Sequence, residues 1–140
     1  MSKAGSRAAA TGILCATLLV SASATEITGD AGDNRLEGTP QTDYFVGGPG
    51  ADIFVINYLS EIADEIEDFS PEQGDLIELT FKTPSGLPLQ SEHLSINRKG
   101  VVKIRLGAKE HDVVDLNRAD LRLQLEPRKG RYFLKFTKKL

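Results

Sequence analysis

Short apolar runs separated by turn-forming residues predict a protein built mostly of β-strands. The gaps between the runs are rich in Gly, Pro, Asp and Asn, which favour tight turns. Within the runs, apolar residues cluster or alternate with polar ones, as expected of short, partly buried strands. The expected strands lie near residues 35–37, 44–46, 53–57, 64–67, 75–81, 101–106, 111–115 and 132–137.

Residues 117–125 fit two alternatives. They suit either a short helix capped by Asn117 or a strand that carries Leu121, Leu123 and Leu125 on one face. The pattern of apolar positions does not separate the two.

A single helical turn is expected at residues 70–74. Ser70 has the side chain of an N-cap, Pro71 suits the first helical position, and Gln73 completes a capping box. Gly74 is then expected to end the turn.

Charge is divided sharply between the two halves of the chain. From Thr25 to Leu79 there are 14 Asp or Glu residues against Arg35 alone, a balance of −13. From Thr80 to Leu140 there are six acidic residues against 14 Lys or Arg, a balance of +8. Acidic crowding of this density destabilises a compact state unless cations or a basic partner offset it. The acidic half therefore predicts either bound hard cations or contact with the basic half.

In the basic half, Lys and Arg alternate with apolar residues, as in the segments 101–106 and 132–136. This alternation is typical of half-buried strands whose charged side chains face water. The pattern favours pairing with the acidic half, or simple solvation, over nucleic-acid binding.

The first 24 residues have the features of a secretory signal peptide. Lys3 and Arg7 precede an apolar run over residues 8–20, and residues 22–24 (ASA) fit a signal peptidase site. The run is shorter than the roughly 20 apolar residues that span a bilayer, so stable membrane insertion is not expected. The chain is predicted to be secreted or periplasmic, with a single domain over residues 25–140.

Cys15 is the only cysteine, and it lies inside this predicted signal peptide. The residues before it lack the small side chain expected ahead of a lipidated cysteine. The mature chain is therefore expected to have neither disulfides nor thiol ligands. A bound metal is one of the few remaining ways to stabilise so small an exported domain, and oxygen atoms would have to hold it.

Three consecutive nine-residue units, 29–37, 38–46 and 47–55, carry the same residue types in the same register. Glycine comes first, Asp or Asn sixth, and a large apolar residue eighth. In this order the positions hold Gly29, Gly38 and Gly47, then Asn34, Asp43 and Asp52, then Leu36, Phe45 and Phe54. Glycine-rich turns expose backbone carbonyls and the sixth residue adds a side-chain oxygen, which suits hard cations such as calcium with their roughly six to eight oxygen ligands.

These columns resemble the nonapeptide G-G-x-G-x-D-x-U-x of hemolysin-type (RTX) calcium-binding proteins, and the third unit, GGPGADIFV, matches it in full. Residues 64–69 (DEIEDF) and 74–79 (GDLIEL) resemble the segment that closes the repeat array in the C-terminal module of secreted RTX proteases. The resemblance implies a parallel β-roll with repeats over 29–55 and a closing segment over 56–81. A β-rich C-terminal cap over 82–140 is expected to follow.

In that family, carboxylates and backbone carbonyls hold calcium between turns 18 residues apart. By this resemblance, the turns that carry Asn34 and Asp52 share one calcium ion, and Gly29, Gly47 and Asp33 belong to the same site. Asn34 is neutral where the family usually has a carboxylate, which is expected to weaken binding.

A second calcium site is implied at Asp43 on the opposite edge of the roll, with Asp64 or Asp68 as the partner. Thr39 and Gln41 replace two glycines of the motif there, which should stiffen the turn. The alternative is a glycine-punctuated β-coil whose acidic residues are solvated and whose calcium sites have decayed.

The predicted function is that of a calcium-binding module that folds or rigidifies on binding calcium and has no catalytic activity. The two histidines, His93 and His111, lie in unrelated contexts, and neither H-E-x-x-H nor G-x-S-x-G occurs in the chain. The alternative is an adhesion or surface-interaction protein that uses the β-roll as a scaffold, with an extracellular surface or another protein as its partner.

Overall fold

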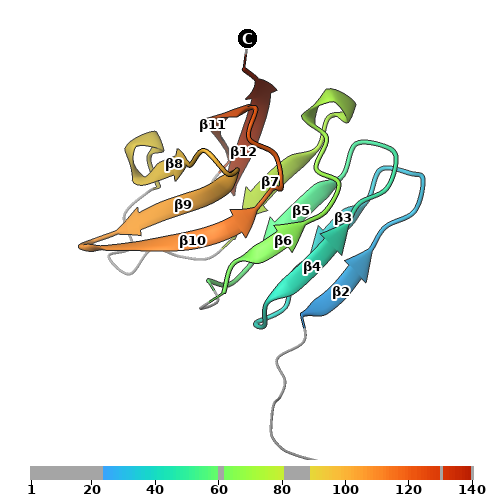
Figure 1. Cartoon of the computed structure of the whole chain (residues 1–140), viewed down its shortest axis with the longest axis horizontal. Helices are drawn as coiled ribbons and strands as arrows, with labels where there is room; N and C mark the ends of the chain where they lie inside the picture. The colour runs from blue at the N-terminus through green and yellow to red at the C-terminus, as the bar shows by residue number, and fades with distance from the viewer. Residues whose placement is uncertain (1–23, 60–61, 81–88, 130, 140) are drawn as a thin grey trace, which may run out of the picture.

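The computed structural model describes residues 24–59, 62–80, 89–129 and 131–139 (Figure 1). The predicted signal peptide up to residue 23 and the start of the predicted cap, residues 82–88, lie outside these ranges. The described residues are mostly β-strand and contain no α-helix, which confirms the prediction of a mostly β protein. Its elements are β2 (Thr25–Thr28), β3 (Arg35–Glu37), β4 (Asp43–Val46), β5 (Ile53–Ile56), β6 (Asp64–Ile66), η3 (Pro71–Gln73), β7 (Leu76–Leu79), η4 (Ser91–His93), β8 (Leu94–Ile96), β9 (Val101–Leu106), β10 (Lys109–Asp115), β11 (Leu121–Arg128) and β12 (Arg131–Lys138).

The strands form two sheets, and strands β2 to β7 alternate between them. Strands β2, β4 and β6 pair in parallel in the first sheet, and β3, β5 and β7 pair in parallel in the second. The C-terminal strands extend both sheets at one end (Figure 1): β10, β9 and β8 continue the first sheet beyond β6, and β12 and β11 continue the second beyond β7. The edge strands are therefore β2 and β8 in the first sheet, and β3 and β11 in the second.

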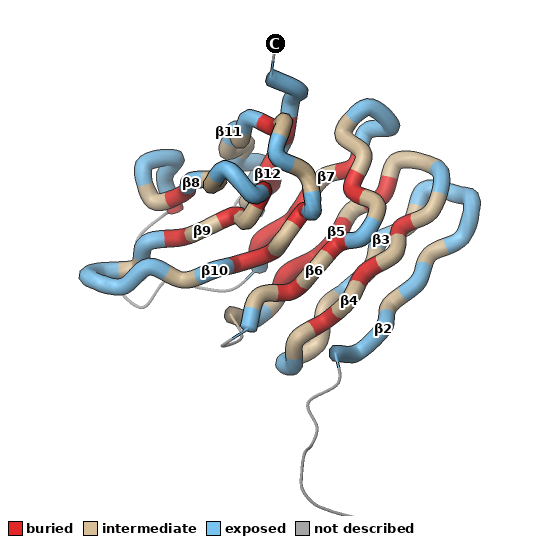
Figure 2. Tube along the Cα trace, in the orientation of Figure 1, coloured by how far each residue is buried: buried red, intermediate tan, exposed pale blue. Residues whose placement is uncertain are grey.

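The eighth residue of each repeat packs into the core between the sheets. Leu36, Phe54 and Ile77 share one register across β3, β5 and β7, and Phe45 lies opposite Ile66 across β4 and β6. All of these are fully buried except Leu36 on the edge strand, which is only partly covered (Figure 2). Each repeat thus buries its apolar residue against residues of other strands, so a single unit has no core of its own.

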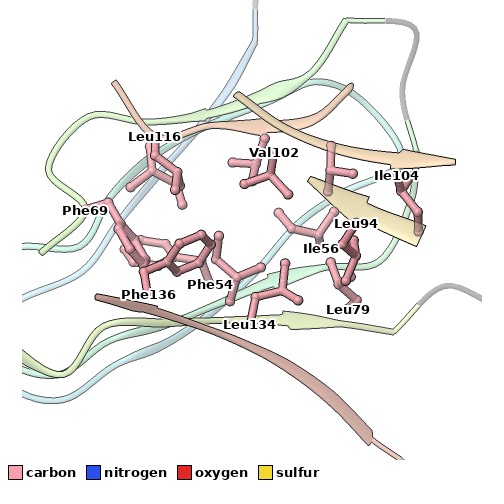
Figure 3. Close-up of a cluster of buried hydrophobic side chains, with 14 of the residues drawn as sticks. Phe54, Ile56, Phe69, Leu79, Leu94, Val102, Ile104, Leu116, Leu134 and Phe136 are labelled. Carbon is pink, nitrogen blue, oxygen red and sulfur yellow. The ribbon is translucent and has the colours of Figure 1, made fainter. Parts of the chain in front are cut away.

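Aromatic rings join the repeat strands to the C-terminal strands. Phe45 and Phe54 meet edge to face with 5.6 Å between ring centroids. Phe69 lies 6.0 Å from Phe54 on one side and 5.0 Å from Phe136 of β12 on the other. Aliphatic side chains of β8, β9 and β10 complete the same cluster (Figure 3). The described residues of both halves therefore share one core.

Ion pairs also join the acidic half to the basic half. Glu78 on β7 is buried, and it binds Arg35 of β3 and Arg131 of β12. Burial raises the pKa of Glu78, but the hydrogen bonds from the two guanidinium groups outweigh it and hold the pKa below its usual range. Contact between the halves, one of the two outcomes expected from the charge pattern, is therefore present.

The expected strands are observed with ends within two residues of the prediction. Strands β2 and β8 were not expected; both are short edge strands that bury few apolar residues, so the sequence pattern is weak there. Of the two alternatives for residues 117–125, the strand is the one observed. β11 begins at the buried Leu121, and Asn117 has a positive φ of 55° instead of capping a helix.

The expected helical turn is present at η3, but the prediction of a capping box is wrong. The Ser70 side chain makes no capping hydrogen bond. Gln73 Oε1 instead accepts a hydrogen bond from the backbone N–H of Gly50, 2.8 Å away in another turn. Gly74 ends the helical turn with a φ of 96°, as expected. A tertiary hydrogen bond has therefore replaced the local cap.

Candidate metal centre

The connections between β2 and β7 lie along two opposite edges of the sheets. One edge, named here the glycine edge, consists of the turns 29–34, 47–52 and 67–75. The other, named the second edge, consists of the described residues of the connections 38–42 and 57–63. The sixth positions of the first and third repeats therefore share the glycine edge, and that of the second repeat lies on the second edge.

On the glycine edge, Asn34, Asp52 and Asp75 form a ladder, and each immediately precedes a strand. The Asn34 N–H donates to Asp52 Oδ1 at 2.8 Å, and the Asp52 N–H donates to Asp75 Oδ1 at 2.9 Å. The first backbone bonds between the strands form here too, from Ile53 N–H to Asn34 O and from Leu76 N–H to Asp52 O. The turns that carry Asn34 and Asp52 are therefore directly stacked.

The first two repeats use the sixth residue to close their own turn. Asn34 Oδ1 accepts a hydrogen bond from the Asp30 N–H at 2.9 Å. Asp43 Oδ2 likewise accepts one from the Thr39 N–H at 2.8 Å. In both turns the donor lies four residues before the acceptor.

The third repeat departs from this arrangement at Asp52. The corresponding donor is the N–H of Gly48, which donates instead to Asp68 Oδ2 at 2.8 Å. Asp52 is fully buried, and its Oδ2 is the one buried side-chain polar atom without a hydrogen-bond partner in the described part of the chain. The repeat that matches the calcium motif in full therefore contains a buried carboxylate oxygen with no protein donor.

Backbone oxygens of the first turn lie close to the third repeat. A Cβ added to Gly48 would stand 2.8 Å from Asp30 O, and one added to Gly50 would stand 2.7 Å from Gly32 O. Both glycines also have positive φ, 80° and 103°, which side chains disfavour. They therefore allow carbonyl oxygens of the first turn to approach the turn of the third repeat.

The structure brings the other residues predicted for this site to the same two turns. A Cβ on Gly29 would stand 2.6 Å from Gly47 O, and one on Gly47 would stand 2.6 Å from Asp52 Oδ2. Asp33 Oδ1 accepts a hydrogen bond from the Ala51 N–H at 2.8 Å. Gly29, Gly47 and Asp33 thus belong to the stacked pair of turns that contains the unpaired oxygen.

Negative charge is concentrated around Asp52. Burial raises the pKa of Asp52, one backbone hydrogen bond lowers it, and the charges of Asp68, Asp33 and Asp30 raise it further. Burial likewise raises the pKa of Asp75 to about 6. A cation beside Asp52 Oδ2 would offset both the desolvation and the mutual repulsion of these carboxylates.

The second edge holds a smaller ladder of two carboxylates. The Asp43 N–H donates to Asp64 Oδ1 at 2.9 Å, and the Thr39 hydroxyl donates to Asp43 Oδ1 at 2.6 Å. Burial raises the pKa of Asp64 to about 7; the hydrogen bond from Asp43 acts against this, and the Asp43 charge adds to it. Both Asp43 oxygens already accept hydrogen bonds from Thr39. They are therefore less available as ligands for a cation than Asp52 Oδ2 on the glycine edge.

Of the two partners predicted for Asp43, Asp64 lies beside it, whereas Asp68 lies on the glycine edge. Asp68 accepts hydrogen bonds from the N–H groups of Gly47 and Gly48 at 2.9 and 2.8 Å. Asp75 was missing from the predicted set although the sequence holds a signal for it. Its Gly-Asp pair immediately precedes β7, just as Asn34 and Asp52 immediately precede β3 and β5.

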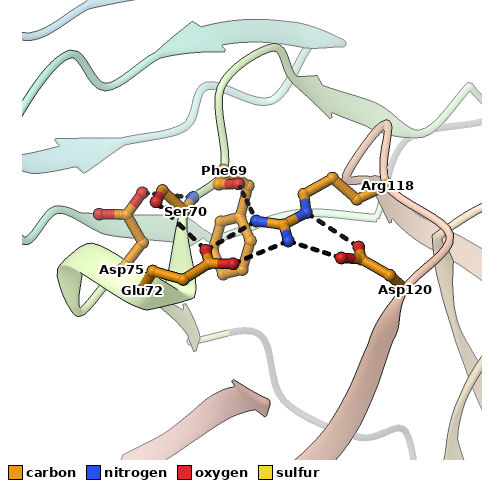
Figure 4. A network of polar contacts seen from close by, with 6 residues as sticks. All are labelled: Phe69, Ser70, Glu72, Asp75, Arg118 and Asp120. Carbon is orange, nitrogen blue, oxygen red and sulfur yellow. Dashed lines mark hydrogen bonds and ion pairs between the residues drawn. The ribbon is translucent and has the colours of Figure 1, made fainter. Parts of the chain in front are cut away.

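Arg118 connects the last turn of the glycine edge to the C-terminal strands (Figure 4). Its guanidinium donates to Glu72 at 2.8 and 3.0 Å and to Phe69 O at 3.3 Å. Asp120 accepts two more hydrogen bonds, at 3.0 and 2.8 Å, from the same group. The hydrogen bonds from Arg118 lower the pKa of Glu72 to about 2. Arg118 therefore anchors the turn that also carries Asp75.

Replacing Arg118 by glutamine should destabilise the protein mainly through loss of the hydrogen bond to the Phe69 carbonyl, worth about 1 kcal/mol. The exposed pair with Glu72 should add little, because water screens it. Urea denaturation followed by circular dichroism measures the change. Arg122→Gln, at an exposed arginine of β11, is the matched control, and equal midpoints for the two variants would contradict the anchoring role.

Among the residues that the structure describes, no three His, Cys, Asp or Glu side chains gather into a metal site of their own. An ion on the glycine edge would therefore need backbone carbonyl oxygens as ligands in addition to Asp52, and calcium readily binds such oxygens.

The described residues contain no helix long and apolar enough to cross a membrane. No protein-family model, curated protein or solved structure matches this chain.

Proposed function

We propose that this chain is an exported calcium-binding module of the hemolysin-type (RTX) kind, without catalytic activity. Strands β2 to β7 would form its parallel β-roll, and the remaining strands its β-rich cap. The proposal is supported by the repeat columns, by the alternation of parallel strands between two sheets, and by the stacking of turns 29–34 and 47–52. The glycine edge would hold the principal calcium ion.

The observation that carries this proposal is that Asp52 Oδ2 is buried and has no hydrogen-bond partner among the described residues. A buried oxygen without a partner costs about 1–3 kcal/mol, and more when charged, unless a proton or a cation compensates it. A calcium ion suits this position because carbonyl oxygens of Asp30 and Gly32 lie in the stacked turn. Asp52 would supply the charged ligand, with those carbonyls as neutral ligands.

Binding would then stabilise the fold at the point where its acidic residues repel one another. Asp68, Asp33 and Asp30 all raise the pKa of Asp52 through their charges, so an ion at this place relieves several repulsions at once. Because the stacked turns exist only in the folded chain, the free energy of calcium binding adds to the free energy of folding. The calcium-free chain is accordingly expected to be loosely folded at the glycine edge, and the calcium-bound chain compact.

A second candidate function, a surface-interaction scaffold with decayed calcium sites, is favoured by one observation. Asp43 and Asp75 each accept hydrogen bonds at both carboxylate oxygens, so their ladders are closed without an ion. In this reading the acidic ladder is structural throughout, and Asp52 is kept neutral by a proton.

Calcium titration of the exported product of the full-length chain, by calorimetry and circular dichroism together, separates the two functions. The Asp52→Asn variant keeps Oδ1 as the acceptor for the Asn34 N–H but removes the charge. We expect the wild type to bind calcium with a Kd of about 10⁻⁴ to 10⁻³ M and magnesium far more weakly. Asp52→Asn should weaken calcium binding at least about tenfold, since it removes the only charged ligand.

Asp112→Asn is the matched control, because it removes an exposed carboxylate of β10 away from both edges. It should leave calcium binding unchanged. The proposal fails if Asp52→Asn binds like the wild type, or if the wild type shows neither heat nor structural change up to about 10 mM calcium, tenfold above the expected range. The scaffold function would then be the one to pursue.

A further inference from the structure

Both ends of the two-sheet stack leave strand edges and apolar side chains open. At one end, β2 and β3 are edge strands, and their inward residues Ile27 and Leu36 are only partly buried. At the other end, the edge strands β8 and β11 contact each other beside an open groove of about 650 Å³. An open strand edge is a template for pairing with another chain.

Apolar and basic side chains line this groove. Its apolar residues are Leu94, Ile96, Leu121, Leu123 and Leu125. Ile96, Leu123 and Leu125 are only partly buried, although they pack against the core. The charged lining residues are Arg122 and Lys139, and none of the lining residues is acidic. The groove therefore suits an acidic segment that brings apolar side chains with it.

The opposite end of the same molecule has this character. Strands β2 and β3 and the turn between them carry the exposed acidic residues Glu26, Asp30, Asp33 and Glu37. Their one basic residue, Arg35, is already paired with Glu78. The β2/β3 end is therefore acidic and incompletely covered, and the β8/β11 groove is basic and incompletely filled.

We propose that a second copy of the chain docks its β2/β3 end onto the β8/β11 groove of the first, so that copies associate head to tail. Ile27 and Leu36 of the docking copy would continue the apolar core into the groove. The acidic side chains beside them would meet Arg122 and Lys139 of the receiving copy. The contact does not use Asp52, and Glu26, the residue reversed in the test below, lies on β2 outside the turns of the proposed calcium site.

Charge selects this arrangement over a symmetric dimer. Pairing two β2/β3 ends would oppose Glu26, Asp30 and Glu37 to the same residues of the other copy, and pairing two grooves would oppose Arg122 and Lys139 to themselves. A head-to-tail contact leaves a free β2/β3 end and a free groove in any assembly that is not a closed ring, so copies can keep adding beyond the dimer. Exposed charges across the contact should make the assembly sensitive to salt.

Charge reversal tests the proposal on the exported product of the full-length chain. Sedimentation velocity at low salt should show an average mass that rises with protein concentration beyond the dimer, and high salt should return the protein to the monomer. Glu26→Arg and Arg122→Glu each reverse an exposed side chain, so both variants should fold, as circular dichroism will verify. Each variant alone should remain monomeric.

Mixing the two variants is the decisive measurement. The reversed β2/β3 end of Glu26→Arg fits the reversed groove of Arg122→Glu, so the mixture should assemble where neither variant does alone. A wild type that is monomeric at every concentration would overturn the proposal. So would a species that stops at a dimer and survives both reversals, because it would indicate a symmetric contact elsewhere.

Discussion

Without added calcium, the protein should be more stable near pH 5 than near pH 7.5, with a difference on the order of several kcal/mol in the free energy of unfolding. Burial raises the pKa of Asp64 to about 7 and that of Asp75 to about 6, against an ordinary value of 3.8. Between about pH 4 and pH 7 the folded chain therefore holds protons that the unfolded chain has released. Stability falls as the pH rises through this window, the reverse of the usual carboxylate effect.

Urea denaturation in the presence of a chelator, repeated across this pH range, measures the effect. Asp64→Asn keeps an oxygen for the Asp43 N–H but is neutral at every pH, so it should flatten the profile. Asp112→Asn, at an exposed position of β10, should leave the profile unchanged. Saturating calcium should reduce only the part of the loss due to Asp75, because an ion beside Asp52 would offset the Asp52 and Asp68 charges that help raise the pKa of Asp75. A chelated wild type that becomes more stable from pH 5 to pH 7.5 would contradict the prediction.

The nine-residue period was sufficient to predict the short strands of the repeats, because each column of the repeat expresses a local requirement, whereas their alternation between two layers was implied only by the resemblance. Glycine at the first position permits a close turn, and the apolar eighth position must face the core. The turns bearing Asn34 and Asp52 therefore stack as the spacing of the first and third repeats indicates. Counting in nines fails after the third repeat, because the Asp43 to Asp64 step is 21 residues and the Asp52 to Asp75 step is 23.

The unpaired oxygen of Asp52 could not be predicted from the repeat. It depends on whether the Gly48 N–H donates within its own turn or to Asp68 of the next one, and the motif is compatible with both. That choice is made by the stacking of the closing segment, since Gly47 donates to the same carboxylate. The most informative feature of the candidate site is therefore a tertiary one.

The C-terminal half was predictable as strands but not as an extension of both sheets. Alternating patterns identify β9, β10 and β12, yet they do not say which strand of the repeats each one joins. Parallel pairing of β10 with β6 and antiparallel pairing of β12 with β7 bring the basic half against the acidic half. Arg131 then pairs with Glu78, and Arg118 pairs with Glu72. The charge balance predicted contact between the halves, but it did not identify the residues.

Gly100→Ala should be severely destabilising, by about 3–5 kcal/mol, because the added methyl group would clash with the backbone of Arg118. Gly100 is buried with a φ of 91°, and a Cβ there would lie 2.0 Å from Arg118 O. Its own carbonyl accepts the Leu116 N–H at 2.9 Å, so the residue cannot simply move away. Gly107→Ala is the matched control: its φ is also positive, at 66°, but a Cβ there would meet nothing within 4 Å. The control should lose only about 1 kcal/mol, the cost of the left-handed conformation.

The same substitution should also reach the glycine edge, because Gly100 packs against the backbone of Arg118. Displacing Arg118 would release Glu72 and Phe69 O, and with them the turn that carries Asp75. Gly100→Ala should therefore weaken calcium binding in calorimetry under conditions where it remains folded, whereas Gly107→Ala should bind as the wild type does. Equal denaturation midpoints for the two variants would remove the steric argument. Equal calcium affinities with unequal midpoints would show that the cap and the glycine edge are stable independently, since only the coupling through Arg118 predicts that both change together.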